Sequence, residues 1–210
     1  MTQKSHDIAT RQVVIGLTGA SGSGKSEAAR ILKGLGAAVI DADAVARAIV
    51  ERREVLDELV EAFGDWVADG QGKFNRAAVS ERAFSDAKFL ERLTVITHKY
   101  IIKEICGFVD SLKSGGNSFP IVIDAPIPVE RGFLDLSDTV WVIKAPRRRR
   151  LERVVARDKI SAGAAEARFM SQLPDADYEK LADVLIENDG DLCNLENELI
   201  RQFNQLKEWS

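Results

Sequence analysis

A glycine-rich segment near the start of the chain has the residue pattern of a phosphate-binding loop. Gly19-Ala20-Ser21-Gly22-Ser23-Gly24-Lys25-Ser26 matches G-x-x-x-x-G-K-[ST] at every specified position. Glycines let the backbone turn its N–H groups toward a phosphate, and the N-terminus of a following helix adds partial positive charge. Lys25 can then neutralise the β- and γ-phosphates, and the Ser26 hydroxyl can bind Mg²⁺. The segment predicts a site for a nucleoside triphosphate and its metal ion.

Two motifs that would define other nucleotide-binding classes are missing from the sequence. It contains no N-K-x-D motif, which GTPases use to read guanine, and no glycine-rich signature such as LSGGQ, which transport ATPases carry. A kinase that acts on a small molecule fits a chain of 210 residues better.

Carboxylates follow two apolar segments that have the pattern of buried strands. Asp124 ends Ile121-Val122-Ile123, where it could face Mg²⁺ and its waters or cap the next turn. Asp41 ends the earlier segment, and we interpret it as a helix N-cap. Asp43 would then lie in the first helical turn. It could accept a proton from an attacking hydroxyl, because ligands of open α/β sheets bind at the carboxyl ends of the strands.

Arginines are concentrated after the fourth apolar segment. The run Arg147–Arg150 is interpreted as a solvated helix face. Arg153 and Arg157 are four residues apart and share one helix face, and cations there could neutralise charge on a transferred phosphoryl group. His98 lies in a helical, mostly apolar segment, so its residue type alone favours packing over ligand binding.

Strand-like and helical segments alternate along most of the chain. We expect strands at about 12–18, 37–41, 119–126, 139–145 and 182–188. The stretch from about 51 to 113 has only helical spacing, interrupted by a glycine-rich loop at 63–75. A helix at 147–157, a polar segment to about 181 and a helical tail at 191–209 complete the chain. This alternation predicts a mostly parallel sheet with helices on both faces.

Composition excludes several classes of protein. Hydrophobic residues make up 45% and charged residues 30%, which is ordinary for a globular chain and excludes wholesale disorder. No apolar run is long enough for a transmembrane helix, and the polar residues 1–12 lack a signal peptide's apolar core, so we expect a disordered leader there. A net charge of −4 gives no support for nucleic-acid binding. Cys106 and Cys193 are expected to be packing residues in a reducing cytoplasm.

Several segments together resemble the dephospho-CoA kinase family. They are GLTGASGSGKS, LGAAVIDADAVAR, FGDWVADGQGKFNRAAVSERAF, ITH with Leu90-Glu91 upstream, IVIDAPIPVE, RVVARD, Gln172 and ADVLIENDG, which span about residues 13–206. The resemblance implies an α/β, three-layer P-loop kinase fold with a five-stranded parallel sheet. Residues 13–210 would form one domain, with a core of 13–50, 118–146 and 182–210, a helical acceptor-binding insertion at about 51–113 and a lid at about 147–181.

The resemblance also implies an activity and a set of site residues. The activity is transfer of the γ-phosphate of ATP, with Mg²⁺, to the ribose 3′-hydroxyl of dephospho-CoA, the last step of coenzyme A biosynthesis. The implied catalytic residues are Asp43, Lys25 and Arg157. ATP would be bound by Ala20, Ser21, Gly22, Ser23, Gly24, Lys25, Ser26, Glu27, Arg157 and Asn188, the last near the adenine. The acceptor would be bound by Asp43, Arg47, His98, Pro126 and Glu130, and Mg²⁺ by Ser26 and Asp124, the latter directly or through water. We expect a monomer or weak homo-oligomer with no nucleic-acid or membrane partner.

The chain departs from the family pattern at three places. Glu27 replaces the usual threonine after the loop serine and would repel phosphates unless it points outward or pairs with a cation. Lys99 replaces the proline after His98, and Ile127-Pro128 replaces a pair of leucines in one wall of the acceptor site. These changes keep two alternatives open: a kinase of another nucleoside or nucleotide, and a nucleotide-binding regulator without catalysis.

Overall fold

The computed structural model describes residues 12–115, 119–125 and 136–207. The described chain divides into two compact units. The first contains the residues up to Ile40 and from Asp110 onward, and the second contains Asp41–Val109. The expected leader lies outside the described residues except for Gln12, which is buried and donates a hydrogen bond from Nε2 to the Phe119 carbonyl. No helix within the described ranges is long and apolar enough to cross a membrane.

The first unit is built on a five-stranded sheet, as the sequence predicts. Its strands are β1 (Val14–Thr18), β2 (Ala38–Asp41), β3 (Ile121–Asp124), β4 (Thr139–Lys144) and β5 (Val184–Glu187), in the order β2-β3-β1-β4-β5. β1 pairs in parallel with β3 and β4, and β4 pairs in parallel with β5. The α/β class and the five parallel strands are therefore confirmed.

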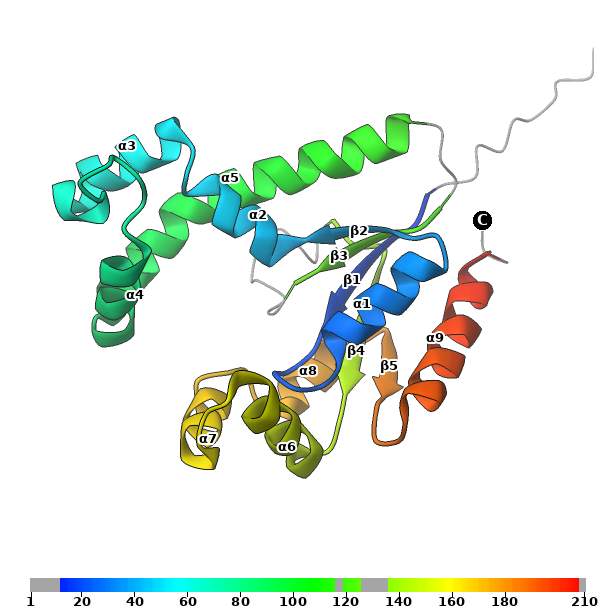
Figure 1. Ribbon diagram of the computed structural model, residues 1–210. Helices are drawn as coiled ribbons and strands as arrows, with labels where there is room; N and C mark the ends of the chain where they lie inside the picture. Colours follow the sequence, from blue (N-terminus) through cyan, green and yellow to red (C-terminus); the bar gives the residue numbers. More distant parts are fainter. Residues whose placement is uncertain (1–11, 116–118, 126–135, 208–210) are drawn as a thin grey trace, which may run out of the picture. The chain divides into compact units, whose positions relative to one another are not determined.

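Helices cover both faces of the sheet, because its central strands are apolar on both sides (Figure 1). On β4, Trp141 and Ile143 pack with α1 (Lys25–Gly34) and α9 (Leu192–Lys207). Val140 and Val142 point to the other face and pack around Tyr178 of α8 (Asp175–Leu181). This alternation is the two-residue period of a strand, and it produces three layers.

The segment after residue 157, which the sequence indicates only as polar, contains two helices. α6 (Arg147–Asp158) is followed by α7 (Ala162–Met170) and then α8. Ser161 caps α7 by accepting the Ala164 N–H, and Pro174 precedes α8. Helices as short as these are stabilised mainly by tertiary contacts, so their sequence pattern is weak.

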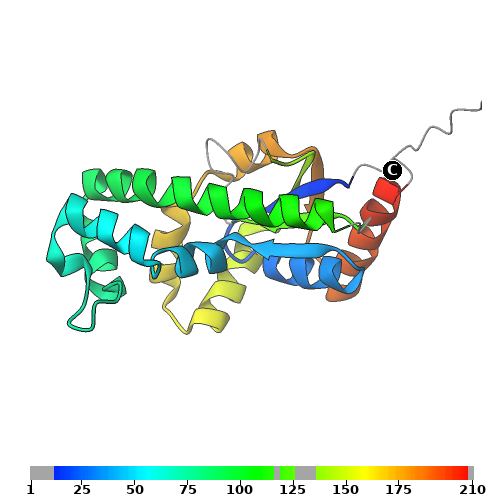
Figure 2. The same cartoon turned by 90° about the horizontal axis from the view of Figure 1, so that it is seen from above.

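The second unit is helical throughout. It contains α2 (Ala42–Ile49), α3 (Arg53–Phe63), the short 3₁₀ helix η1 (Asp65–Val67), α4 (Arg76–Ser85) and most of α5 (Ala87–Ser114). Figure 2 shows α5, in green, as one continuous helix. The glycine-rich loop includes η1 and one antiparallel bridge between Ala68 and Phe74. The expected insertion at about 51–113 overlaps this unit, which begins at Asp41.

Candidate functional site

The phosphate-binding loop lies where the direction of the chain's connections reverses. From β1 the chain passes beyond β3 to reach β2, whereas from β3 it passes beyond β1 to reach β4. In open α/β sheets such a reversal opens a crevice at the carboxyl ends of the two strands. Thr18 ends β1 just before the loop, and Asp124 ends β3 beside Leu17. The sheet therefore brings the loop and this carboxylate to the same crevice.

Lys25 and Asp124 form an ion pair across this crevice. The Lys25 ammonium donates to Asp124 Oδ1, and both side chains are largely shielded, with 15% and 12% of their surface exposed. The loop lysine is thus one partner of the strand-end carboxylate. A magnesium role for Asp124 stays a prediction, and it would require the Lys25 ammonium to give way to the divalent cation at this carboxylate.

Two loop glycines occupy positions that no side chain could fill. Gly22 and Gly24 have positive φ angles of 79° and 101°. A Cβ on Gly22 would lie 2.7 Å from the carbonyl oxygen of Arg150, and a Cβ on Gly24 would lie 2.1 Å from Nδ2 of Asn188. The glycines are therefore required both by backbone conformation and by the close packing of α6 and the β5–α9 segment against the loop.

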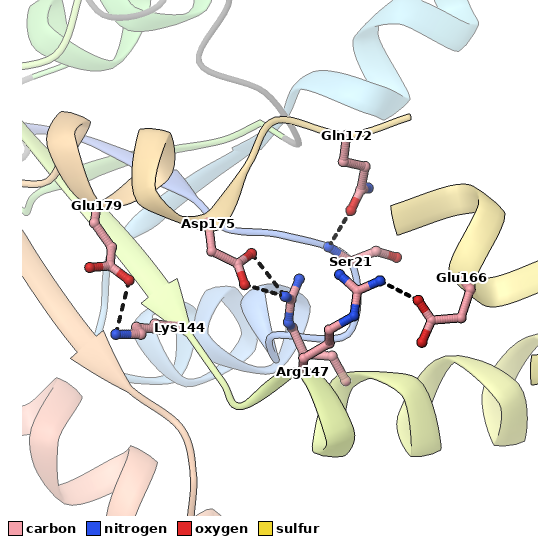
Figure 3. A network of polar contacts seen from close by, with 8 residues as sticks. Ser21, Lys144, Arg147, Glu166, Gln172, Asp175 and Glu179 are labelled. Carbon is pink, nitrogen blue, oxygen red and sulfur yellow. Dashed lines mark hydrogen bonds and ion pairs between the residues drawn. The ribbon is translucent and has the colours of Figure 1, made fainter. Parts of the chain in front are cut away.

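Side chains from three distant segments hold the loop backbone. Gln172, between α7 and α8, accepts the Ser21 N–H at 3.1 Å (Figure 3). Asn188, after β5, donates from Nδ2 to the Ser23 carbonyl at 2.7 Å. Arg153 of α6 donates to the carbonyls of Gly22 and Ser23, at 3.3 Å each. From the sequence, Asn188 was expected near the adenine, and Arg153 had no definite role. Contacts between residues so far apart along the chain cannot be predicted from their spacing.

The helices of the expected lid are joined by ion pairs that Figure 3 shows from close by. Arg147 pairs with Glu166, linking α6 to α7, and Lys144 pairs with Glu179, linking β4 to α8 at 2.9 Å. Arg150 donates twice to Asp175 of α8, at 2.6 and 2.8 Å, with its side chain only 4% exposed. The interpretation of the arginine run as a solvated face is wrong for Arg150, because its position on α6 points inward against α8 and charge pairing offsets its burial.

Arg157 is held by the residue that follows it. Its Nε and Nη2 donate to Asp158, which also accepts from Arg168 of α7. These hydrogen bonds, first from Arg157 and then from Arg168, lower the pKa of Asp158 to about 2. An ATP-binding role for Arg157 stays a prediction, and this role would require its guanidinium to turn from Asp158 toward the phosphates.

Glu27, which follows the phosphate-binding loop, is paired with a cation, Arg30. Its carboxylate accepts three hydrogen bonds from Arg30 one helical turn later, at 2.6 to 3.1 Å. These bonds lower the pKa of Glu27. The negative charge is thus compensated on the outer face of α1, and the repulsion expected from this departure is reduced.

The second unit contains three of the five candidate acceptor residues, Asp43, Arg47 and His98. Asp41 caps α2 by accepting the Ala44 N–H at 2.9 Å, which confirms its expected role. Asp43 is exposed in the first turn of α2, and Arg47 lies 3.8 Å from the Asp41 carboxylate. His98 is half-buried on α5, and burial lowers its pKa below the ordinary 6.5. Pro126, Glu130 and the Ile127-Pro128 departure lie outside the described residues.

Lys99, one of the departures from the family pattern, joins two helices of the second unit. Its Nζ donates to Glu58 of α3 at 2.5 Å, and the neighbouring Tyr100 hydroxyl donates to the same carboxylate at 2.7 Å. The bond from Lys99, followed by that from Tyr100, lowers the pKa of Glu58. The lysine therefore contributes to the packing of α3 on α5.

The second unit also contains an open cleft of about 750 Å³ that was not predicted from the sequence. Phe63, Trp66 and Phe89 form an aromatic wall, with the Phe63 and Phe89 rings 4.6 Å apart. Arg92 lies over the Phe63 ring, and Arg82 is among the other cleft residues. The aromatic residues of the F-G-D-W segment were the signal that could have indicated it. Neither Arg47 nor His98 is among the described residues that line this cleft.

Known proteins similar to this chain point to one family. The family model for dephospho-CoA kinase matches residues 13–194. A dephospho-CoA kinase from Carboxydothermus hydrogenoformans is 36% identical over 94% of this chain and 97% of its own length. One from Corynebacterium diphtheriae is 39% identical over 90% of this chain and 96% of its own length.

Solved structures agree with the sequence comparisons. A Thermus thermophilus protein aligns with a TM-score of 0.79 at 30% identity, covering 93% of this chain and 98% of its own. The dephospho-CoA kinase from Campylobacter jejuni aligns with a TM-score of 0.70 at 25% identity, covering 94% of this chain and 98% of its own. A shikimate kinase from Acinetobacter baumannii, 15% identical with a TM-score of 0.51, shares the fold. The family match and the identity over nearly the whole chain confirm the resemblance, and this chain belongs to the dephospho-CoA kinase family.

Proposed function

We propose that this protein transfers the γ-phosphate of ATP to the ribose 3′-hydroxyl of dephospho-CoA, producing coenzyme A and ADP. The observation that carries this proposal is the complete phosphate-binding loop, with Lys25 paired to the strand-end Asp124, in a chain of the dephospho-CoA kinase family. Phosphoryl transfer relies mostly on positioning and charge neutralisation, so a rigid loop with a shielded cation is suitable for it.

The residues of the first unit would handle the nucleotide. Loop N–H groups would bind the phosphates, and Lys25 would move its ammonium from Asp124 toward the β- and γ-phosphates. Ser26 and Asp124 offer hard oxygen ligands of the kind that Mg²⁺ takes in small number from proteins. Mg²⁺ usually keeps several waters and takes other ligands from the substrate's phosphates, so it needs few oxygens from the protein. Mg²⁺ at this place would neutralise phosphate charge.

The second unit would bind the acceptor. The exposed Asp43 would orient the 3′-hydroxyl and accept its proton as the oxygen attacks the γ-phosphorus. The bond from the γ-phosphorus to the oxygen that bridges it to the β-phosphate would break, and ADP would leave with that oxygen. Arg47 and His98 would bind the acceptor, and Arg157 would neutralise charge on the transferred group.

An ADP-release assay with Mg-ATP tests this function. Dephospho-CoA, AMP, uridine and no acceptor would be compared, and the product would be identified by mass. We expect strong ADP release only with dephospho-CoA, with the Lys25→Ala variant as a control for contaminating kinases. Release with AMP or uridine but not with dephospho-CoA would instead assign the protein to another acceptor. ATP binding without release with any acceptor would favour the regulator alternative.

A further inference from the structure

The usefulness of a phosphate-binding loop depends on the orientation of its peptide groups. The structure contains no cis peptide bonds within its described part. A trans peptide points its C=O and the following N–H in opposite directions. Holding a loop carbonyl on the outer side therefore turns the next N–H toward the phosphates. The outward carbonyls need hydrogen-bond donors of their own, because buried carbonyls without partners are costly.

Asn188 and Arg153 supply these donors from two different segments. The Ser23 carbonyl accepts from Asn188 Nδ2 at 2.7 Å and from Arg153 Nη1 at 3.3 Å, so it is held twice. Arg153 Nη1 also lies 3.3 Å from the Gly22 carbonyl. Asn188 is only 6% exposed, which leaves its amide little freedom to turn away.

The two side chains also hold each other. Arg153 Nη2 donates to Oδ1 of Asn188 at 3.4 Å and to the Asn188 carbonyl at 3.5 Å. Because the amide oxygen accepts from Arg153, the amide nitrogen has to face the Ser23 carbonyl. The absence of room for a Cβ at Gly24 shows how closely the Asn188 amide lies against this peptide. We call Arg153 and Asn188 the loop clamp.

We propose that the loop clamp positions the Ser23–Gly24 peptide, so that its N–H points to the phosphates of the bound nucleotide. In this role Asn188 acts through the loop and not through the adenine. The inference rests on the proposed function only in requiring that the loop binds a polyphosphate. Arg153 and Asn188 are positioning residues, and their loss should weaken ligands in proportion to the phosphate contacts that these ligands make.

The test compares a ligand that has a base with one that has none. Dissociation constants of Mg-ATP and of Mg-tripolyphosphate would be measured by calorimetry for Arg153→Met and Asn188→Asp. The first keeps the apolar stem of the side chain, and the second keeps its size but removes the donor to Ser23. Arg148→Met, on the exposed side of α6, and Asn204→Asp, exposed on α9, are matched controls.

We expect both ligands to bind about 10- to 100-fold more weakly to each clamp variant, the range for losing a charged or buried hydrogen bond. The controls should bind like the unchanged protein. A loss confined to ATP would overturn the proposal, because tripolyphosphate lacks the adenine. Unchanged binding of both ligands would overturn it as well.

Two further measurements separate positioning from folding. Arg153→Lys, which keeps the charge with fewer aligned donors, should lose less affinity than Arg153→Met, and the double variant should lose less than the sum of the single losses. The unfolding temperature should change little in the arginine variants. Equal losses in Arg153→Lys and Arg153→Met, or additive losses in the double variant, would contradict a coupled clamp. Because tripolyphosphate carries no acceptor, a failure of dephospho-CoA to be phosphorylated would leave this test intact.

Discussion

The two units of this protein have apolar cores of different size, while ion pairs at the surface occur in both. The first unit has an apolar core between sheet and helices, in which Trp141, Leu199 and Phe203 are almost completely buried. Buried or partly buried polar side chains form hydrogen bonds to the backbone of its phosphate-binding loop. The second unit has a smaller core around Leu59, and its helices are joined by ion pairs at the surface, such as Arg52–Glu104.

This difference matches the different tasks proposed for the units. A phosphate site gains from donors that are already aimed when the ligand arrives, because no reorganisation is then needed. Exposed ion pairs contribute only about 0–1 kcal/mol each, so they constrain a helical unit weakly. We therefore expect changes in the first unit to impair nucleotide binding, and changes in the second to impair acceptor turnover or stability while nucleotide binding remains.

The largest effect should come from Gly24→Ala. The new Cβ would overlap the Asn188 amide, and the backbone would be strained at a φ of 101°. We expect kcat/KM to fall by about 1,000-fold or more, measured by ADP release. Gly34→Ala is the matched control, because its Cβ would meet nothing within 4 Å. It should keep full activity and gain stability, since glycine is unfavourable inside a helix. Full activity in Gly24→Ala would show that the loop is not rigidly held.

Asp43→Ala should lower kcat by about 100-fold or more, because a group that accepts a proton in the transition state contributes this much. The dissociation constant of Mg-ATP should stay unchanged, since we propose nucleotide binding for the first unit. Asp57→Ala, which removes an exposed carboxylate paired with Arg53 on α3, is the control and should leave kcat intact. A full-rate Asp43→Ala variant would remove this residue from the mechanism.

Leu59→Ala tests whether the second unit can be weakened by itself. Leu59 is fully buried, so its truncation should cost about 2–5 kcal/mol of unfolding free energy, measured with urea. Tripolyphosphate should still bind under native conditions with its ordinary dissociation constant. The same substitution at Leu199, fully buried in the first unit, is the comparison and should weaken both stability and binding. Equal loss of tripolyphosphate binding in the two variants would contradict the separation of roles.

Acidification should act on the second unit through His98. Its folded pKa is lowered by burial, so the unfolded chain binds a proton more readily than the folded protein does. Stability should therefore fall as pH decreases through 6.5 and below, and His98→Asn should reduce this dependence. Proton NMR titration gives the pKa directly, with His98→Asn identifying the resonance. A pKa of His98 at or above 6.5 would contradict the expectation.

The smallest effect should come from Lys99→Ala. The lysine side chain is 54% exposed, and exposed ion pairs contribute about 0.2–1 kcal/mol at most. The loss should shrink as salt is added, because salt screens the pair with Glu58. Urea unfolding at low and high ionic strength measures it. A loss as large as that of Leu59→Ala would show that ion pairs, and not the small core, dominate this unit.

Features that depend on neighbours along the chain could be predicted from the residues alone. The phosphate-binding loop, the five strands, the long helix α5 and the Asp41 cap follow from local spacing and from residue chemistry within a few positions. The family was also visible there, since its segments recur in order along the chain, and the family match confirms it. The helices α7 and α8 were not visible, because their stability depends on tertiary partners.

Contacts between side chains that are distant along the chain depend on the folded structure. Lys25 and Asp124 are 99 positions apart, Arg153 and Gly22 are 131 apart, and Asn188 and Ser23 are 165 apart. The burial of Arg150 also depends on α8, whose Asp175 lies 25 positions away. Periodicity shows which face of an element is apolar, but it does not show which polar groups another element will present to it. Those pairings are set by the order of strands and by the packing of helices on the sheet.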